Sequence, residues 1–356
     1  MNAVPKRLIA VPALAAALAF TACAPAPSAP SESESPSAAQ DCARMVTNSG
    51  GLEDRSFNQS SWEGLELASS EYGIDVQALV STGPSDLEPN LELAVGSGCG
   101  FILTVGWELA EGTLAQAEAN PDLHFAIVDE KVEAPNVVPI VFDTAQASYL
   151  AGYLAAGMSK TGVVATFGGE PQPPVALFMD GFVDGVAKYN EVHGAEVRVL
   201  GWDKAAQDGT FIGSWEDTNL GKVATENFIA QGADVILPVA AQAGEGTLAA
   251  ALDHGGVLVI WVDADGVETL PAEYHPVLLT SVLKKTQDAV VELVGRHLDG
   301  SFTGGTYVGT LENGGTDIAP YHELDDAVSD DLKAEIDELR AQIISGEIVV
   351  ESVNAP

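Results

Sequence analysis

A repeating unit of the chain is clearest in residues 138–167, which read VPIVFDTAQASYLAGYLAAGMSKTGVVATF. The unit begins with a short apolar run, Val138–Phe142, and ends with a second one, Val163–Phe167. Between them lies Ala145–Ser159, which has the length and the composition of an α-helix. Near-continuous apolar strands that alternate with helices predict a parallel sheet covered by helices on both faces.

The same alternation extends in both directions from this stretch. Further strands are predicted at Ala43–Thr47, Val76–Leu79, Phe101–Val105, Phe125–Val128, Val197–Leu200, Val235–Val239, Val257–Val262, Leu278–Val282 and Thr306–Leu311. Further helices are predicted at Ser56–Tyr72, Val175–Tyr189, Leu220–Gln231, Gly244–Leu252, Lys284–Leu298 and, as an amphipathic helix, Asp330–Ile344.

About ten strand–helix units are more than one sheet holds comfortably. The sequence therefore predicts an α/β protein with two doubly wound lobes and a ligand cleft between them. In such sheets ligands bind beyond the carboxyl ends of the strands, so the loops that follow strands are where functional residues are expected.

The amino terminus has the layout of a secretion signal. Lys6 and Arg7 precede an apolar run, Leu8–Phe20, which is too short to span a bilayer comfortably. Small residues then lead to Cys23, as in the lipobox of bacterial lipoproteins, although Phe20 stands where Leu is usual. We expect residues 1–22 to be a lipoprotein signal peptide and Cys23 to be acylated; the competing hypothesis is an ordinary signal peptide with an incidental cysteine.

Residues 23–41 are almost entirely Ala, Pro, Ser and Glu after the cysteine, and such a segment forms a flexible tether. The predicted location is the outer face of the cell membrane, held there by the N-terminal lipid. The chain contains 15 Lys and Arg against 52 Asp and Glu. This acidity argues against nucleic acid or anionic lipid as a partner of the folded part.

Two further cysteines, Cys42 and Cys99, each stand just before an apolar run. If those runs are neighbouring parallel strands, both cysteines lie at the same edge of the sheet, within reach of a disulfide. Export would permit that bond. The competing hypothesis is a pair of buried free thiols.

The loop after the first strand offers several candidate binding residues. Gly50 and Gly51 allow unusual backbone angles. Phe57 stands at the start of the next helix, and Asn48 and Asn58 can both donate and accept hydrogen bonds. Taken alone, an apolar residue at a helix start is more often a packing staple.

The stretch Gly50–Gly64, GGLEDRSFNQSSWEG, is similar to the signature of the basic membrane protein family of lipoproteins, which includes purine nucleoside receptors of ABC transport systems. The resemblance continues through Asn120-Pro121-Asp122, Ser148–Gly152, Asp180-Gly181-Phe182, Gln231–Ile236, Thr280–Lys284 and Ile344–Ile348. It implies a type I periplasmic-binding fold, in which the chain crosses between the lobes three times.

The resemblance also implies the residues of a nucleoside site. Phe57 and Trp215, the latter where the family usually has Phe, would clamp the base, since base–aromatic stacking is favourable. Asn58 would face the base. The ribose hydroxyls would be bound by three residues at strand ends, Asp129, Asp263 and Lys284. Without the resemblance, Trp215 could equally be a surface or core residue, the two aspartates loop caps, and Lys284 a solvated charge.

Three positions depart from the family. Asn48 stands where Asp is usual, and an amide that donates and accepts matches the N6/N1 edge of adenine, which suggests a shift toward adenosine. Ala241 replaces a usual Gly, which would narrow the ribose pocket. Gln146 replaces a usual Glu.

The sequence contains no Walker loop, zinc-ligand spacing or G-x-S-x-G motif. We therefore expect no metal, no cofactor and no enzymatic activity, against the competing hypothesis of a secreted nucleoside hydrolase. The same fold also suits a receptor for riboflavin, a sugar or a signalling molecule, or a tethered sensor without a transporter. The expected partners are a nucleoside and an ABC transporter permease, with the protein itself a monomer.

The expected lobe boundaries follow from the order of the strands and the three crossings. The first lobe is predicted to contain residues 42–144 plus about 265–305, and the second lobe about 145–264 plus 306–356.

Overall fold

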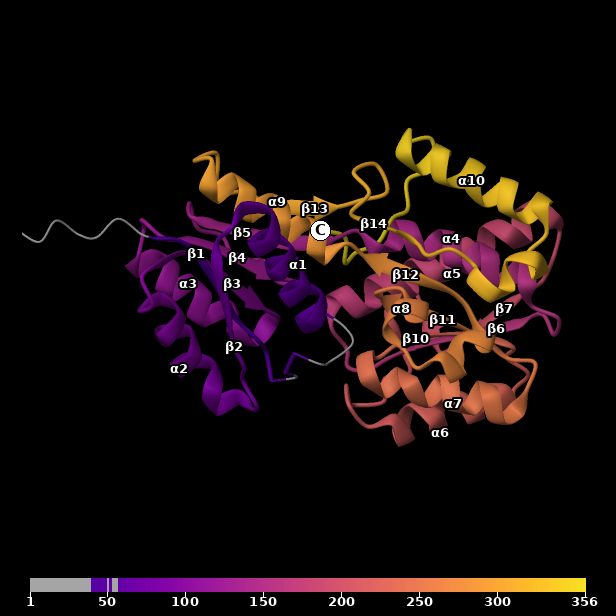
Figure 1. Ribbon diagram of the computed structural model, residues 1–356. Helices are drawn as coiled ribbons and strands as arrows, with labels where there is room; N and C mark the ends of the chain where they lie inside the picture. Colours follow the sequence, from indigo (N-terminus) through magenta and orange to yellow (C-terminus); the bar gives the residue numbers. More distant parts are fainter. Residues whose placement is uncertain (1–39, 50, 53–56) are drawn as a thin grey trace, which may run out of the picture. The chain divides into compact units, whose positions relative to one another are not determined.

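The computed structural model describes residues 40–49, 51–52 and 57–356 (Figure 1). The predicted signal peptide, the acylation site Cys23 and nearly all of the predicted tether lie outside the described residues. The stretch from Ala39 to Pro356 forms one compact unit, and it contains two sheets of six strands.

The first lobe is built on a sheet of six parallel strands in the order β13-β5-β4-β3-β1-β2. Their bounds are β1 Gln40–Val46, β2 Asp75–Leu79, β3 Cys99–Val105, β4 His124–Val128, β5 Val137–Phe142 and β13 Tyr307–Gly309. β3 and β5 are buried along their whole length, as expected for strands covered on both faces.

Helices cover both faces of this sheet, and successive side chains of a strand point to opposite faces. Phe101, Leu103 and Val105 of β3 pack with α1 (Phe57–Tyr72) and α9 (Thr286–Leu298). Ile102, between them, packs on the other face with α2 (Pro84–Val95) and α3 (Ala110–Ala119).

The second lobe is built on a sheet in the order β14-β12-β11-β10-β6-β7, in which only β14 is antiparallel. Its strands are β6 Val163–Gly168, β7 Arg198–Leu200, β10 Val235–Val239, β11 Leu258–Asp263, β12 Leu278–Lys284 and β14 Thr316–Ile318. One face packs against α4 (Thr144–Met158), α5 (Pro173–His193) and α10 (Asp330–Ile344). The other packs against α6 (Thr218–Ala230) and α7 (Glu245–His254).

Smaller elements complete the structure. They are the hairpin β8 Trp202–Asp203 and β9 Asp208–Gly209, the short helix α8 Gly266–Thr269, and the 3₁₀ turns η1 Trp107–Leu109, η2 Ala241–Gly244, η3 Ala272–Val277 and η4 His322–Ala327. The sequence did not predict β14 or the hairpin, because none of these strands contains an apolar run.

Helices α4 and α5 approach each other unusually closely, and glycines make this possible. A Cβ atom on Gly152 of α4 would lie 2.1 Å from the carbonyl oxygen of Phe182, and one on Gly181 of α5 would lie 2.2 Å from that of Ala145. No side chain fits at such distances. This contact fixes the rotation of α5 and so decides where its remaining residues point.

The chain passes between the lobes three times, as the family resemblance implied. The crossings follow β5, β12 and β13, and Figure 1 shows α9 and β13, coloured orange, among the purple elements of the first lobe. Gln146 belongs to these crossings, since its side chain donates to Asp143 Oδ2 (2.8 Å) and accepts from the amide of Leu311 (3.0 Å).

The second crossing corrects the lobe boundaries expected at about residues 265 and 305. β12 pairs with β11 in the second sheet, so the chain returns to the first lobe only after Lys284. β13, which was expected in the second lobe, pairs with β5 in the first. The apolar sequence of β12 makes it a strand, but its sheet is decided by pairing with a distant segment.

A disulfide joins Cys42 of β1 to Cys99 of β3, so the pairing that the sequence left open is present in the structure. The two strands are parallel neighbours, and both cysteines are buried at their amino-terminal ends. The bond therefore lies at the edge of the sheet opposite the loops that follow the strands.

Two half-buried histidines of the first lobe form a pair. The Nδ1 atoms of His124 and His297 lie 2.9 Å apart, and the ring of Phe302 stacks on His124 with centroids 4.3 Å apart. Burial lowers the pKa of both histidines; for His297 its neighbour His124 lowers the pKa further, while Asp41 opposes this. The folded state thus favours the neutral rings.

We expect this pair to make the protein less stable in mild acid. Because the folded-state pKa lies below the unfolded value of about 6.5, the unfolded chain binds more protons as the pH falls through that value, and stability is lost. Each histidine contributes a slope of up to about 1.4 kcal/mol per pH unit. Urea unfolding between pH 7.5 and 5 should show a shallower pH dependence for His124→Gln/His297→Gln than for the wild type. The exposed His254, changed to Gln, is the control, and an unaltered slope in the double variant would refute the prediction.

Candidate ligand-binding site

A cavity of about 610 Å³ lies where loops of the two lobes converge. Several lining residues stand at a strand end or one or two positions after it: Asn48 after β1, Trp107 after β3, Asp129 after β4, Ala241 after β10, and Asp263 and Lys284, the last residues of β11 and β12. In parallel α/β sheets, ligands bind beyond the carboxyl ends of the strands, which is where this cavity lies. The volume is in the range of small-molecule sites, about 300–1,000 Å³.

Three charged side chains meet in this cavity. The Lys284 ammonium donates to Asp129 Oδ2 at 2.5 Å and lies 3.6 Å from Asp263 Oδ1. The side chains of Lys284, Asp129 and Asp263 are 6%, 14% and 13% exposed, so the group is largely removed from solvent. Lys284 also lies over the ring of Phe178, 5.2 Å from its centroid. Asp129 belongs to the first lobe and the other two to the second, so this charged trio connects the lobes.

Burial and the attraction between opposite charges both act on the pKa values of Asp129 and Lys284. Burial raises the pKa of Asp129, and the ammonium of Lys284 opposes that effect. Burial alone would lower the pKa of Lys284, but the two carboxylates outweigh it and raise the pKa above its usual value. The carboxylate oxygens that face the cavity can accept hydrogen bonds from hydroxyl groups.

Backbone strain is concentrated around the same cavity. Within the described ranges, five residues other than glycine have positive φ, and three of these line the cavity: Asp129 (59°), Ala241 (45°) and Asp263 (69°). Such conformations are costly for residues with a Cβ atom and persist mainly at functional sites. At Ala241 the left-handed backbone gives a physical reason why the family uses glycine there.

The first loop contributes Asn48, whose side-chain oxygen accepts a hydrogen bond from Asn58 Nδ2. Asn48 lines the cavity, while Asn58 is fully buried behind it and is not part of the lining. Phe57 begins α1, but its side chain lies outside the described residues, so its predicted stacking role stays a prediction.

Trp215 lines the cavity from the second lobe, on the loop that precedes α6. Gly169 makes room for its indole ring, because a Cβ atom there would lie 2.5 Å from Trp215 Cε3. The backbone oxygen of Trp215 accepts from the amide of Ala243 (2.9 Å), which fixes the loop. The half-buried ring thus offers a flat apolar surface to a ligand.

Several lining residues were not predicted from the sequence. Trp107 is 55% exposed at the cavity, and its place directly after a strand was the signal that could have identified it. Phe178 lines the cavity from α5, where helical periodicity alone indicates only a core residue. Val353–Pro356 also contribute to the lining, and no motif marks them.

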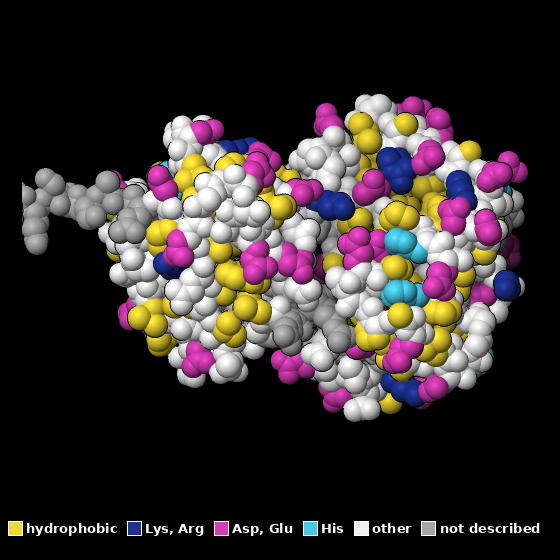
Figure 2. All heavy atoms as spheres, viewed as in Figure 1, with side chains coloured by type: hydrophobic (Ala, Val, Ile, Leu, Met, Phe, Trp, Pro, Cys, Tyr) yellow, Lys and Arg dark blue, Asp and Glu magenta, His cyan; other side chains and the backbone are white. Residues whose placement is uncertain are grey.

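The lining is mainly acidic among its charged side chains. Six carboxylates face two amines: Glu108, Asp129, Glu130, Glu170, Glu216 and Asp263 against Lys131 and Lys284. Figure 2 shows acidic side chains spread over both lobes on the face it displays. Such a field disfavours a phosphorylated ligand and suits a neutral one.

In the part of the chain that the structure describes, no helix combines the length and apolar character required to cross a bilayer.

Comparisons with known proteins agree with this geometry. The Bmp family, described as "ABC transporter substrate-binding protein PnrA-like", matches residues 43–354. A "CD4+ T-cell-stimulating antigen" of Listeria monocytogenes is 32% identical over 324 residues, covering 86% of this chain and 87% of that protein. The "ABC transporter nucleoside-binding protein BmpA" of Lactococcus lactis is 30% identical over 328 residues, covering 87% and 89%. An ABC transporter solute-binding protein from Aeropyrum pernix superposes with a TM-score of 0.74 at 25% identity, covering 86% and 92%.

Two doubly wound lobes, three crossings and a cavity at the strand ends are the architecture of the type I periplasmic-binding fold, which the solute-binding protein of Aeropyrum pernix shares. The chain belongs to the Bmp family of PnrA-like ABC transporter substrate-binding proteins.

Proposed function

We propose that this protein is a lipid-anchored receptor on the outer face of the cell membrane that binds a purine nucleoside and delivers it to an ABC transporter permease. The observation that carries the ligand class is the buried trio of Asp129, Asp263 and Lys284 in a cavity that Trp215 also lines. Vicinal hydroxyls of a ribose can donate to the two carboxylates, while the indole stacks on a base. The nucleoside-binding BmpA of Lactococcus lactis supports the same assignment.

The acidic lining of the cavity favours nucleosides over nucleotides as ligands. A phosphate placed among six carboxylates would be repelled, and the ammonium of Lys284 is already paired with the carboxylates of the trio. A neutral nucleoside leaves the charge of the cavity unchanged. The same argument admits riboflavin and sugars, which are the competing ligands.

A thermal-shift panel on the protein, refolded from denaturant to remove bound solute, tests the proposal. Adenosine or guanosine at 100 times its Kd should stabilise the protein by about 2.7 kcal/mol, whereas AMP and free ribose should not at the same concentration. A response to riboflavin or a sugar with none to nucleosides would overturn the nucleoside assignment.

The identity of residue 48 should set the preference among purines. Asn48→Asp keeps an oxygen that accepts from Asn58 but removes the amide donor, so we expect affinity to move from adenosine toward guanosine. The exposed Asn227 on α6, changed to Asp, introduces the same charge away from the cavity and is the control. Calorimetric titration that finds equal adenosine-to-guanosine affinity ratios in the wild type and in the Asn48 variant would contradict this role.

A further inference from the structure

The last eight residues, Val349–Pro356, form part of the cavity wall although they belong to no helix or strand. We call them the 349–356 segment. Val350 is buried in the core of the second lobe, and Val353–Pro356 then reach the cavity lining. Because no ladder of backbone hydrogen bonds fixes this segment, side-chain contacts must determine its position.

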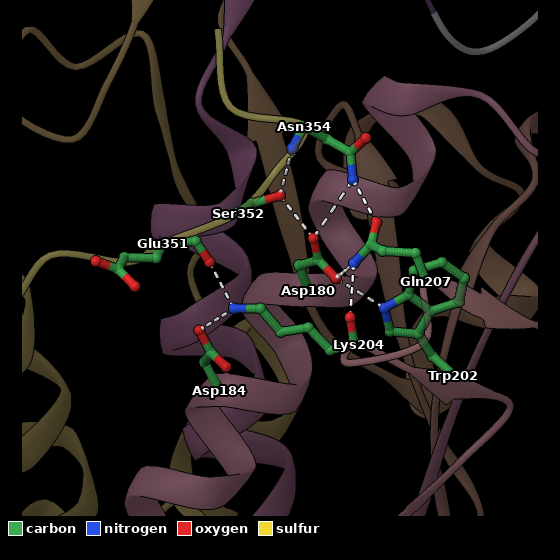
Figure 3. A network of polar contacts seen from close by, with 8 residues as sticks. All are labelled: Asp180, Asp184, Trp202, Lys204, Gln207, Glu351, Ser352 and Asn354. Atoms are coloured by element: carbon green, nitrogen blue, oxygen red, sulfur yellow. Dashed lines mark hydrogen bonds and ion pairs between the residues drawn. The ribbon is translucent and has the colours of Figure 1, made fainter.

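Those contacts converge on Asp180, a fully buried residue of α5 (Figure 3). Its Oδ1 accepts from Trp202 Nε1 and Gln207 Nε2, both at 2.8 Å. Its Oδ2 accepts from Ser352 Oγ at 2.6 Å and has a longer contact of 3.5 Å with Asn354 Nδ2. One carboxylate oxygen is thus hydrogen-bonded to the β8–β9 region of the second lobe, and the other is hydrogen-bonded to the 349–356 segment.

Neighbouring side chains reinforce this attachment. Asn354 Nδ2 donates to Gln207 Oε1 at 2.7 Å, and Lys204 Nζ donates to the backbone oxygen of Glu351 at 2.5 Å. Gln207 has a positive φ of 52°, and its side-chain amide contacts both Asp180 and Asn354. A buried carboxylate that lost its Ser352 and Asn354 donors would be left partly unsatisfied, and that cost keeps the segment in place.

The anchored segment exposes an apolar side chain at the cavity. Val353 is 82% exposed and lines the cavity, whereas Val349, four residues earlier, is 72% exposed and does not line it. A ligand in the cavity can cover Val353, and burial of apolar surface adds to affinity. Phe178, two residues before Asp180 on α5, lines the same cavity, so the anchor and the wall share one rigid helix.

We propose that the 349–356 segment is a specificity-determining wall of the ligand site, attached through Asp180, and that it slows release of the ligand. This inference rests on the proposed function for the identity of the ligand. The attachment itself can be measured without any ligand.

The wall is tested with two matched variants of the full-length protein. Val353→Ser should weaken adenosine binding by about three- to tenfold, as expected for removing part of a buried apolar side chain, while Val349→Ser should leave it unchanged. Titration calorimetry gives both values. Equal affinities for the wild type and both variants would show that Val353 is not part of the binding surface.

The anchor is tested with Ser352→Ala/Asn354→Ala, which leaves Asp180 and Val353 in place. In the protein without ligand, hydrogen–deuterium exchange of peptides that cover 350–356 should be faster in this variant than in the wild type. Stopped-flow tryptophan fluorescence should show adenosine leaving at least about tenfold faster, as expected when a contact of about 1.4 kcal/mol is lost. Unchanged exchange would show that Ser352 and Asn354 do not hold the segment in place, whatever the ligand is.

The two proposals fail in different ways. If the wild type binds no nucleoside, the proposed function is wrong, and the wild type and its variants are compared with the riboflavin or sugar that the wild type does bind. If the wild type binds adenosine and the Val353 and Ser352/Asn354 variants bind and release it equally well, only the inference about the segment is wrong.

Discussion

Lys284→Met is expected to destabilise the protein by on the order of 3–5 kcal/mol and to abolish measurable ligand binding. The variant keeps most of the length of the side chain but removes the ammonium, which lies over the ring of Phe178 and within 4 Å of both Asp129 and Asp263. Two buried carboxylates would then lose the positive charge that lies between them. Urea unfolding at pH 7.5 and calorimetric titration with adenosine measure the two effects.

Acidification should reduce this loss of stability. Without Lys284, repulsion and burial raise the pKa of one carboxylate in the folded state, so the folded protein binds a proton that the unfolded chain does not. Stability then increases as the pH falls from 7.5 toward 5, relative to the wild type. Asp129→Asn in the Lys284→Met background removes one of the two negative charges and should therefore also restore part of the lost stability.

The neighbouring residue supplies the control. Lys285 is exposed, so Lys285→Met changes the net charge by the same amount but leaves the contacts of Lys284 with Asp129 and Asp263 in place. It should alter stability by less than about 0.5 kcal/mol, as is usual for surface substitutions. If both methionine variants were equally stable, the trio would contribute nothing to folding, and the argument for a preorganised polar site would be lost.

The trio also shows how far sequence reasoning reaches. Asp129, Asp263 and Lys284 were identified because they stand at strand ends in stretches that resemble the family, and the structure brings all three together with Asn48, Trp215 and Ala241 around one cavity. The apolar runs located the strands because burial on both faces leaves few other residue types possible.

Two features could not be predicted because they depend on contacts distant in sequence. β12 is an apolar strand like its neighbours, and only its pairing with β11 places Lys284 at the end of the second sheet. The 349–356 segment has no hydrophobic period, and its anchor, Asp180, precedes Ser352 by 172 residues. The sequence marked Asp180 only as part of a family motif, with no sign that it is a buried acceptor.

Cys42→Ser/Cys99→Ser is expected to lower the free energy of unfolding by about 4 kcal/mol. The two cysteines are 57 residues apart in sequence, and the stabilisation follows from the entropy that a cross-link of this length removes from the unfolded chain. Urea unfolding should show the loss, and a reductant should bring the wild type to the stability of the variant while leaving the variant unchanged. A variant as stable as the oxidised wild type would contradict the prediction.

Ligand affinity should respond differently. The disulfide lies at the amino-terminal end of β3, and Trp107 and the cavity lie beyond its carboxyl-terminal end, roughly 20 Å away along the strand. Molecules of the double variant that are folded should therefore bind adenosine with the Kd of the wild type. A parallel loss of affinity would mean that the bond also positions the loop that contains Asn48, since β1 connects that loop to Cys42. The two sets of variants thus separate two contributions to the stability of the protein. The disulfide stabilises the sheet that supports the site, and Lys284 stabilises the site itself.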